Sequence, residues 1–249
     1  VHYISSNAVF PDVPGKLYRD DTDISSFASA IQGGYGQAKW VADRISQRAR
    51  EAGVPVNIYR PGNIGPHTHS GSFNSNDLQT MILKACLVTR TAPSDADWQF
   101  EMTPVDVVAM TIVEAAAGKL GKNYNVVQEA PLSTTLIFSR LFSLGLIQEF
   151  LPLKEWLTRV AAVGKAQQDG DLMILGATQT MTNHVLTSTA SFACENFLSS
   201  IRSPRLFHHQ MSTSYIDRFL HRMNASLSSN EVALPLSTMD THLSQERSR

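Results

Sequence analysis

The first part of the chain shows the apolar pattern of a strand followed by a helix. Val1–Ile4 is a run of β-branched and aromatic residues, which is typical of a buried strand, and small polar residues follow it. From Tyr35 to about Ala52, apolar residues recur at three- and four-residue steps, and this spacing predicts an amphipathic helix. Charged residues such as Asp43 are expected on its surface. Its apolar face, expected to be buried, consists of Ala38, Val41, Ala42, Ile45 and Ala49.

A second strand and two further helices follow. Gly53 ends the first helix, and the apolar run Val54–Tyr59 predicts a short buried strand. A strand, a helix and another strand within about sixty residues are typical of a parallel α/β sheet. The pattern then predicts helices at Asp77–Val88 and at 104–113, and a short strand at Asn123–Val127.

Beyond residue 130 the pattern becomes mainly helical. Leu, Phe and Trp recur at helical spacing over Leu136–Val163, and Gly, Gln and Asp near Gly164–Gly170 predict a loop. Two more helices are predicted at Ser191–Ile201 and Ser214–Met223. The Ser-rich stretch Ala225–Arg249 has little pattern and is expected to be a frayed tail.

Composition and charge are those of an ordinary globular protein, and they argue against some partners. The 249 residues include 21 Lys and Arg against 22 Asp and Glu, a formal net charge of −1. Near-zero charge argues against a nucleic acid or an anionic membrane as the main partner. Cys86 and Cys194 cannot form a disulfide scaffold, so a reducing compartment such as the cytoplasm is expected. The most apolar stretch, Leu136–Leu153, is interrupted by Arg140 and Glu149, so no membrane-spanning helix is predicted.

The first predicted helix carries a pair of residues suited to proton transfer at a carbonyl group. Tyr35 and Lys39 are four residues apart, which places them one turn from each other on the same helix face. An ammonium group beside a tyrosine favours the phenolate form, and it can also hold the ribose hydroxyls of a cofactor. Ser6, at the end of the first predicted strand, is the natural third group to hold the carbonyl oxygen. A Tyr and a Lys at this spacing arise by chance in many surface helices. Here the helix follows a strand that ends in Ser-Ser and precedes the segment Arg60–Pro66, and this order of parts is a far more specific signal than the pair alone.

The chain carries a set of segments whose motifs occur together in one superfamily. They are Val1–Ser6, Gly34–Ala42, Val56–Ile64, Gly71–Asp77 and Thr103–Ala109. With these segments the chain resembles the later part of an extended short-chain dehydrogenase/reductase. It is most similar to the thioester reductase domains that terminate nonribosomal peptide synthetases, polyketide synthases, aminoadipate reductases and carboxylic acid reductases. The similarity is good over residues 1–130 and weak afterwards.

The resemblance implies an NADPH-dependent reductase that converts a thioester to an aldehyde or an alcohol. Under this hypothesis Tyr35 donates the proton, Lys39 binds the nicotinamide ribose and tunes Tyr35, and Ser6 polarises the carbonyl group. The predicted catalytic residues are therefore Ser6, Tyr35 and Lys39. The predicted cofactor-binding residues are Tyr35, Lys39, Pro61, Gly62 and Ile64.

The resemblance also implies two partners. The substrate would be a phosphopantetheine thioester on an acyl or peptidyl carrier domain, and Asn74 and Asp77 are predicted to contact it. For Asp77, a carboxylate stabilised at a helix N-terminus is an equal alternative. The other partner would be an upstream portion of the same reductase, because no glycine-rich turn for a dinucleotide follows any predicted strand of this chain. We therefore expect the C-terminal portion of a longer enzyme, which would be unstable or prone to aggregation in isolation.

The expected fold is α/β, with a helical region after the sheet. The second half of a Rossmann-type parallel sheet is expected at residues 1–130, a small, mainly helical substrate-side region at 131–224 and a flexible tail at 225–249. No metal site is predicted, because no Cys or carboxylate stands at ligand spacing from His67 and His69.

Two alternatives to the thioester reductase stay open. One is another extended short-chain enzyme, such as a sugar-nucleotide epimerase or dehydratase or a flavonoid-type reductase. The other is a non-catalytic remnant that acts as an interaction module. The presence of Ser6, Tyr35 and Lys39 together argues against the second alternative, and the lack of a glycine-rich turn argues for it.

Overall fold

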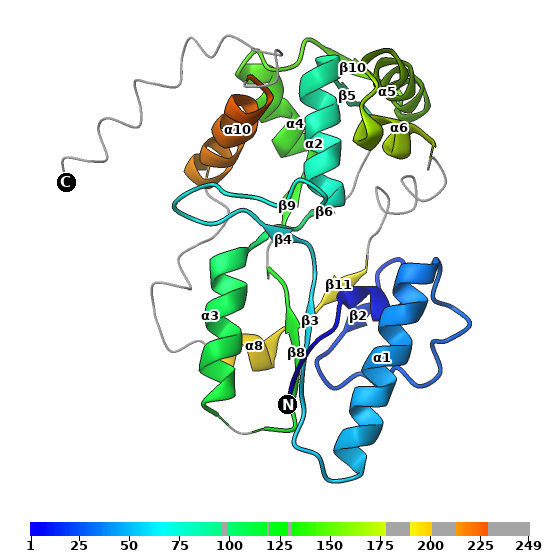
Figure 1. Ribbon diagram of the computed structural model, residues 1–249, viewed down its shortest axis with the longest axis vertical. Helices are drawn as coiled ribbons and strands as arrows, with labels where there is room; N and C mark the ends of the chain where they lie inside the picture. The colour runs from blue at the N-terminus through cyan, green and yellow to red at the C-terminus, as the bar shows by residue number, and fades with distance from the viewer. Residues whose placement is uncertain (96–98, 119, 129–130, 178–189, 201–212, 229–249) are drawn as a thin grey trace, which may run out of the picture. The chain divides into compact units, whose positions relative to one another are not determined.

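The computed structural model of the chain describes residues 1–95, 99–118, 120–128, 131–177, 190–200 and 213–228 (Figure 1). The chain divides into two compact units, each assembled from separate stretches of sequence. Unit 1 comprises Val1–Phe73, Trp98–Leu132 and Thr187–Ile216. Unit 2 comprises Asn74–Asp97, Ser133–Leu186 and Asp217–Arg249. The predicted assignment of functions to residues 1–130, 131–224 and 225–249 stays a prediction.

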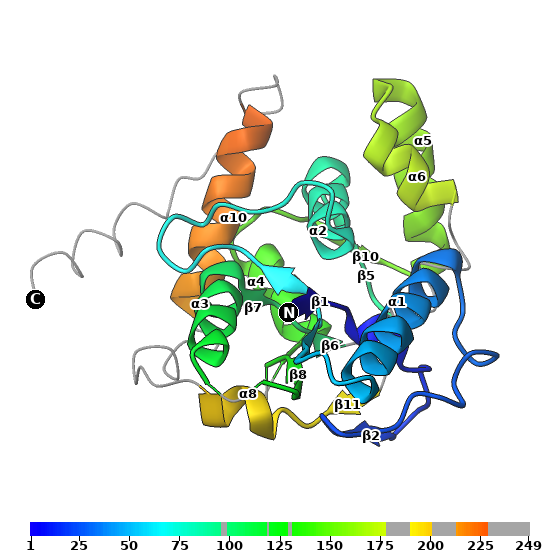
Figure 2. The same ribbon diagram turned by 60° about the horizontal axis from the view of Figure 1, so that its bottom comes forward.

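Unit 1 is built around a parallel three-stranded sheet in the order β1–β3–β8. The strands are β1 (His2–Ile4), β3 (Asn57–Pro61) and β8 (Asn123–Val126), and β3 pairs with both neighbours. Figures 1 and 2 show α1 (Gly34–Glu51) on one face of this sheet and α3 (Val105–Ala116) on the other. Every residue of β3 is buried, as expected for a parallel strand covered on both faces. The predicted parallel α/β fold is thereby confirmed.

Helix α1 forms where the pattern predicts it, but its faces differ from the prediction. Val41 and Ile45 are 48% and 64% exposed, whereas Asp43 is fully buried at 0%. Asp43 is buried because its carboxylate forms an ion pair with Arg60 of β3 inside the unit. The predicted burial of Ala38, Val41 and Ile45 is therefore wrong, and so is the expected surface position of Asp43.

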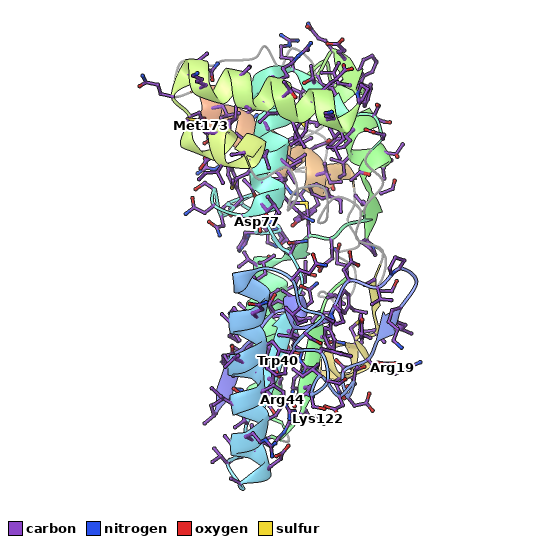
Figure 3. The ribbon with its side chains drawn as sticks, turned by 90° about the vertical axis from the view of Figure 1, so that its right-hand side faces the viewer. Arg19, Trp40, Arg44, Asp77, Lys122 and Met173 are labelled. Atoms are coloured by element: carbon purple, nitrogen blue, oxygen red, sulfur yellow. The ribbon has the colours of Figure 1, made fainter. Side chains whose placement is uncertain are left out.

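A small aromatic cluster holds the loop between β1 and α1. Trp40, which lies on α1 (Figure 3), donates its indole N–H to the Ile24 carbonyl at 2.8 Å. Phe10 and Tyr18 stack with their ring centres 4.7 Å apart, and the Tyr18 hydroxyl donates to the Pro11 carbonyl. These contacts give the loop a core of its own.

Several short elements of unit 1 have no signal in the apolar pattern. The strand β11 (Ser191–Phe192) occupies the start of the helix predicted at Ser191–Ile201, which begins only at α8 (Glu195–Ser200). That prediction is wrong at its N-terminal end, because β11 pairs with β2. Residue 201 lies outside the described residues. The other short elements are η1 (Asn7–Val9), β2 (Leu17–Tyr18), β4 (Ile64–Gly65), β6 (Gln99–Phe100) and β7 (Thr103–Pro104).

Unit 2 is mainly helical. Its elements include α2 (Leu78–Thr89), β5 (Thr91–Pro93), β9 (Leu132–Ser133, at its boundary), α4 (Thr134–Ser143), β10 (Glu149–Leu151), α5 (Leu153–Gln167) and α6 (Gly170–Ala177). Trp156 of α5 is fully buried, and its indole N–H donates to the Thr91 carbonyl at 3.1 Å. The loop predicted near Gly164–Gly170 is wrong in its first half, because α5 continues to Gln167. Its Gly164 allows close contact with α6, since a Cβ there would lie 2.8 Å from that of Leu172.

The last described helix, α10 (Thr213–Ser228), confirms the helix predicted at Ser214–Met223. It extends into the stretch expected to be a tail, and residues 229–249 lie outside the described residues. In the part of the chain that the structure describes, no helix is both long enough and apolar enough to cross a lipid bilayer.

Candidate active site

The carboxyl ends of the parallel strands bring predicted site residues to one edge of the sheet in unit 1. Ser6 follows β1, and Gly62 follows β3. In open α/β sheets, ligands bind outside this edge. Tyr35 and Lys39 come to the same region on the first turns of α1.

Ser6 lies where β1 gives way to the short helix η1. Its backbone is extended (φ −160°, ψ 155°), and its Oγ accepts a hydrogen bond from the Ala8 N–H at 3.2 Å. Because the oxygen is the acceptor in this bond, the hydroxyl hydrogen is able to donate to a substrate oxygen. The neighbouring Ser5 hydroxyl instead donates to Asp43 at 2.7 Å. The catalytic role of Ser6 stays a prediction.

Tyr35 and Lys39 lie one turn apart on α1. The Lys39 ammonium nitrogen is 5.9 Å from the centre of the Tyr35 ring and donates to the Ile4 carbonyl at 3.3 Å. Ile4 is the last residue of β1, so the ammonium group connects the tyrosine to the strand that leads into Ser6. Tyr35 is 65% exposed, which leaves its hydroxyl accessible to a ligand.

Gly36 allows the first turn of α1 to approach η1 closely. A Cβ at this residue would lie 3.1 Å from the Ala8 carbonyl oxygen and 2.8 Å from a side-chain carbon of Ile31. A larger residue would therefore push α1 away from the turn that Ser6 caps. In this way Gly36 helps to set the separation between Tyr35 and Ser6.

A carboxylate holds the segment that follows β3. Glu101 accepts hydrogen bonds from the Asn63 N–H at 2.8 Å and from the Thr103 hydroxyl at 2.6 Å. A Cβ at Gly62 would lie 1.7 Å from the Glu101 Oε2 oxygen, so the lack of a side chain makes room for the carboxylate. The sequence does not mark Glu101 as a site residue, because its partner Asn63 is 38 residues away along the chain.

The predicted nicotinamide-binding residues share this short segment. Pro61 is buried at the end of β3, and the Gly62 N–H donates to the Val126 carbonyl at 3.2 Å. Ile64, in β4, is 38% exposed. Their contact with a nicotinamide stays a prediction.

Asn74 and Asp77 belong to unit 2, and both side chains serve local structure. Asp77 lies at the N-terminus of α2 (Figure 3), where it accepts hydrogen bonds from the Gln79 and Thr80 N–H groups at 3.0 and 3.2 Å. Burial raises the pKa of the Asp77 carboxyl, although these hydrogen bonds act in the opposite direction. The Asn74 Oδ1 accepts from the Asn76 N–H at 3.1 Å. Their predicted contact with a substrate stays a prediction.

Asp106 connects α3 to the loop that follows β4. It lies in the first turn of α3 and accepts hydrogen bonds from the Thr68 N–H at 3.1 Å and the Thr68 hydroxyl at 2.5 Å. Burial raises the pKa of the Asp106 carboxyl, but the hydrogen bonds from Thr68 and from the Asp106 backbone, together with the charge of His67, lower the pKa overall.

The sequence of this chain is similar to those of known proteins. Residues 1–112 match the family model NAD_binding_4, described as "Male sterility protein". The glycine betaine reductase ATRR of Emericella nidulans is 32% identical over 161 residues, which are 63% of this chain and 13% of that protein. The L-2-aminoadipate reductase of Saccharomyces cerevisiae is 33% identical over 135 residues, which are 54% of this chain and 10% of that protein. The chain thus spans only a small part of the length of these relatives.

Solved structures show the same relationship. The terminal R domain from the myxalamid PKS-NRPS biosynthetic pathway has a TM-score of 0.78 and 26% identity, over 93% of this chain and 58% of that chain. A dTDP-glucose 4,6-dehydratase from Bacillus anthracis has a TM-score of 0.56 at 12% identity, which shows a shared fold alone. In its fold, and over residues 1–112 in its sequence, the chain thus resembles domains of the extended short-chain dehydrogenase/reductase class. Within this class, the predicted resemblance to the terminal reductase domains and the aminoadipate reductases is confirmed.

Proposed function

We propose that this chain provides the catalytic residues of a reductase that uses NADPH to reduce a carrier-bound acyl or peptidyl thioester to an aldehyde or an alcohol. The observation that carries the proposal is the position of the Lys39 ammonium group, which contacts both the Tyr35 ring and the strand that leads into Ser6. The relatives support it, since they include an L-2-aminoadipate reductase and a terminal R domain.

Each of these residues has a separate task in the proposed reaction. The Ser6 hydroxyl donates a hydrogen bond to the carbonyl oxygen of the substrate and stabilises the negative charge that develops there. The Tyr35 hydroxyl gives its proton to the same oxygen. The C–S bond of the resulting hemithioacetal then breaks, which releases the pantetheine thiol and leaves the aldehyde. The positive charge of Lys39 stabilises the tyrosinate that remains.

The donor groups at this edge fit the nicotinamide end of a dinucleotide. The Lys39 ammonium carries three N–H donors suited to ribose hydroxyls, and the exposed Tyr35 hydroxyl lies one helix turn before it. Pro61, Gly62 and Ile64 would border the nicotinamide ring. A bound nicotinamide would supply the hydride for the reduction. The choice of NADPH over NADH rests on the resemblance to the thioester reductases.

The proposed partner is a carrier domain that presents the substrate on a phosphopantetheine arm. One structural neighbour, with a TM-score of 0.65, is a thiolation-reductase di-domain from an archaeal non-ribosomal peptide synthetase. Asn74 and Asp77 would contact the bound substrate.

The proposal predicts that reduction depends on Tyr35 and Lys39. The full protein that carries this sequence is given NADPH and an acyl-pantetheine thioester, and aldehyde and alcohol formation are measured. We expect Tyr35→Phe and Lys39→Met each to lower kcat by about 10²–10⁴-fold, because each removes a group used in proton transfer. Lys16→Met, at an exposed lysine of the same unit, should leave the rate unchanged.

Three other results would contradict the proposal in different ways. Unchanged turnover in Tyr35→Phe would remove the catalytic assignment. Conversion of a sugar nucleotide without thioester reduction would favour an epimerase or dehydratase. Failure to bind either nicotinamide cofactor, with the protein folded, would favour an interaction module.

A further inference from the structure

Arg60 of β3 and Asp43 of α1 form an ion pair in the interior of unit 1, where both side chains are 0% exposed. The Arg60 Nε donates to the Asp43 Oδ2 at 2.9 Å, and its Nη2 donates to the Oδ1 at 3.1 Å. Two parallel hydrogen bonds determine the orientation of the two groups as well as their separation. The pair therefore joins a helix and a strand in one defined geometry.

Neighbouring groups complete the hydrogen bonding of the pair. The Ser5 hydroxyl donates to the Asp43 Oδ2 at 2.7 Å, and the Gln47 amide donates to the Oδ1 at 2.7 Å. Each carboxylate oxygen thus accepts two hydrogen bonds. On the other side, the Arg60 guanidinium lies 5.1 Å from the centre of the Phe10 ring. The pair is buried, and its carboxylate is fully bonded.

Stability alone is a weak reason for such a pair. Taking two charges out of water costs free energy that their attraction often fails to recover, and apolar residues of similar volume are frequently as stable. What the pair adds is a fixed relation between the elements that it joins. Here those elements are the ones that carry the predicted catalytic and nicotinamide-binding residues.

Asp43, Ser5 and Arg60 each lie next to a predicted site residue, either directly in the sequence or one helix turn away. Asp43 follows Lys39 by four residues on α1, which places the two one turn apart. Ser5 directly precedes Ser6. Arg60 lies at the end of β3, immediately before the segment proposed to border the nicotinamide.

We propose that Asp43, Arg60 and Ser5 form a positioning network that locks α1 to β1 and β3 and so sets the geometry of the catalytic residues. The inference rests on the proposed reductase function. The network acts through its neighbours on each element and does not itself touch the substrate.

Two variants separate positioning from stability, and the chain offers a matched control. Arg60→Lys keeps the charge but loses the two-pronged contact. Asp43→Leu combined with Arg60→Met replaces the pair with apolar side chains, which is compatible with a stable fold. The control is Arg140→Lys, because Arg140 makes the same two-pronged contact with Asp217 in unit 2, at 3.0 and 2.7 Å.

The measurements are kcat and KM for the acyl-pantetheine thioester, NADPH affinity and the melting temperature, all in the full protein that carries this sequence. We expect both pair variants to stay folded and to lower kcat by about 10- to 100-fold, since small displacements of reacting groups have effects of this size. KM and the NADPH affinity should change by less than about threefold, because the binding contacts remain. Arg140→Lys should leave kcat within about twofold of the wild type.

Two results would overturn the positioning role. One is a folded pair variant that keeps the wild-type kcat. The other is loss of the folded state in both pair variants under conditions where Arg140→Lys stays folded, which would show a purely structural pair.

A separate readout distinguishes failure of this inference from failure of the proposed function. If the wild type reduces no thioester, the proposed function fails, and fluorine NMR of fluorotyrosine at residue 35 then tests the network alone. Positioning predicts a shifted or broadened signal in Arg60→Lys and an unchanged signal in Arg140→Lys. Identical spectra for the wild type and Arg60→Lys would overturn the inference.

Discussion

Gly62 and Gly34 both adjoin predicted site residues, but the space around them differs. At Gly62 the place of a Cβ is taken by the Glu101 carboxylate, whereas nothing lies within 4 Å of a Cβ at Gly34. A methyl group at residue 62 must therefore displace an anion that holds Asn63 and Thr103. The flexible Glu101 side chain is able to move, so the main loss is that of its hydrogen bonds.

We expect Gly62→Ala to lower the free energy of unfolding by about 1–3 kcal/mol, because hydrogen-bonding groups lose their partner. Gly34→Ala should leave it unchanged or raise it by up to about 1 kcal/mol, since alanine favours a helix. Urea unfolding followed by circular dichroism measures both. The double variant Gly62→Ala with Glu101→Ala should lose less than the sum of its single effects, and strict additivity would contradict the steric argument.

At the scale of elements, α2 and α3 each carry an aspartate at the N-terminal end, and the environments of these two carboxyl groups differ. Asp77 caps α2, and burial raises the pKa of its carboxyl despite two backbone hydrogen bonds. For Asp106 in the first turn of α3, burial also raises the pKa, but the hydrogen bonds from Thr68 and the Asp106 backbone, together with the charge of His67, lower the pKa overall. The Thr68–Asp106 contact thus fastens the loop after β4 to α3 through a charge that the folded state stabilises.

This contact should depend on pH. A folded-state pKa below the unfolded value means that the contribution to stability is present above about pH 4 and is lost as the pH falls through the folded-state pKa. We expect Thr68→Val to reduce stability by about 1–2 kcal/mol at neutral pH, because the carboxylate loses a hydroxyl donor, and by less in acid. Urea unfolding over a series of pH values tests this, with the exposed Thr135→Val as the control. A loss independent of pH would contradict the assignment.

At the scale of the whole molecule, each compact unit contains one buried cysteine that can report on it. Cys194 lies in unit 1 in a cluster with Tyr124, and Cys86 lies in unit 2 on α2. Burial raises the pKa of the Cys86 thiol, so this thiol should react little with labelling reagents while the unit is folded. The two cysteines therefore offer separate reporters of the two units.

If each unit is a cooperative folding unit, substitutions in its core should shift only its own reporter. We expect Trp156→Phe to destabilise unit 2 by about 1–3 kcal/mol, through lost volume and the lost bond to the Thr91 carbonyl, and to advance labelling of Cys86 in rising urea. Tyr124→Leu should destabilise unit 1 by a similar amount, about 1–3 kcal/mol, and advance labelling of Cys194 in rising urea. Mass spectrometry of each labelled cysteine gives both midpoints. A joint shift of both cysteines in either variant would contradict independent unfolding.

The main helices and strands follow from sequence patterns because their signals are local. The helical spacing after Tyr35, the cap at Asp77 and the Gly53 stop each depend on residues within a few turns of one another. The spacing of Tyr35 and Lys39 likewise implies one helix face, which α1 confirms. The order of strand, helix and strand was sufficient to indicate the parallel sheet, and the motifs within these segments indicated the family resemblance.

Other features depend on partners that are distant in the chain. Two-residue strands such as β2 and β11 carry too little sequence to predict and exist through their pairing. Periodicity predicts that the apolar face of α1 is buried. In the structure Asp43 is buried instead, because Arg60 supplies a countercharge in the adjacent strand. Glu101 is tied to its site by Asn63, far away in the chain. Local patterns thus specify the elements and their order, whereas the polar contacts that lock the candidate site come from long-range packing, which no local pattern records.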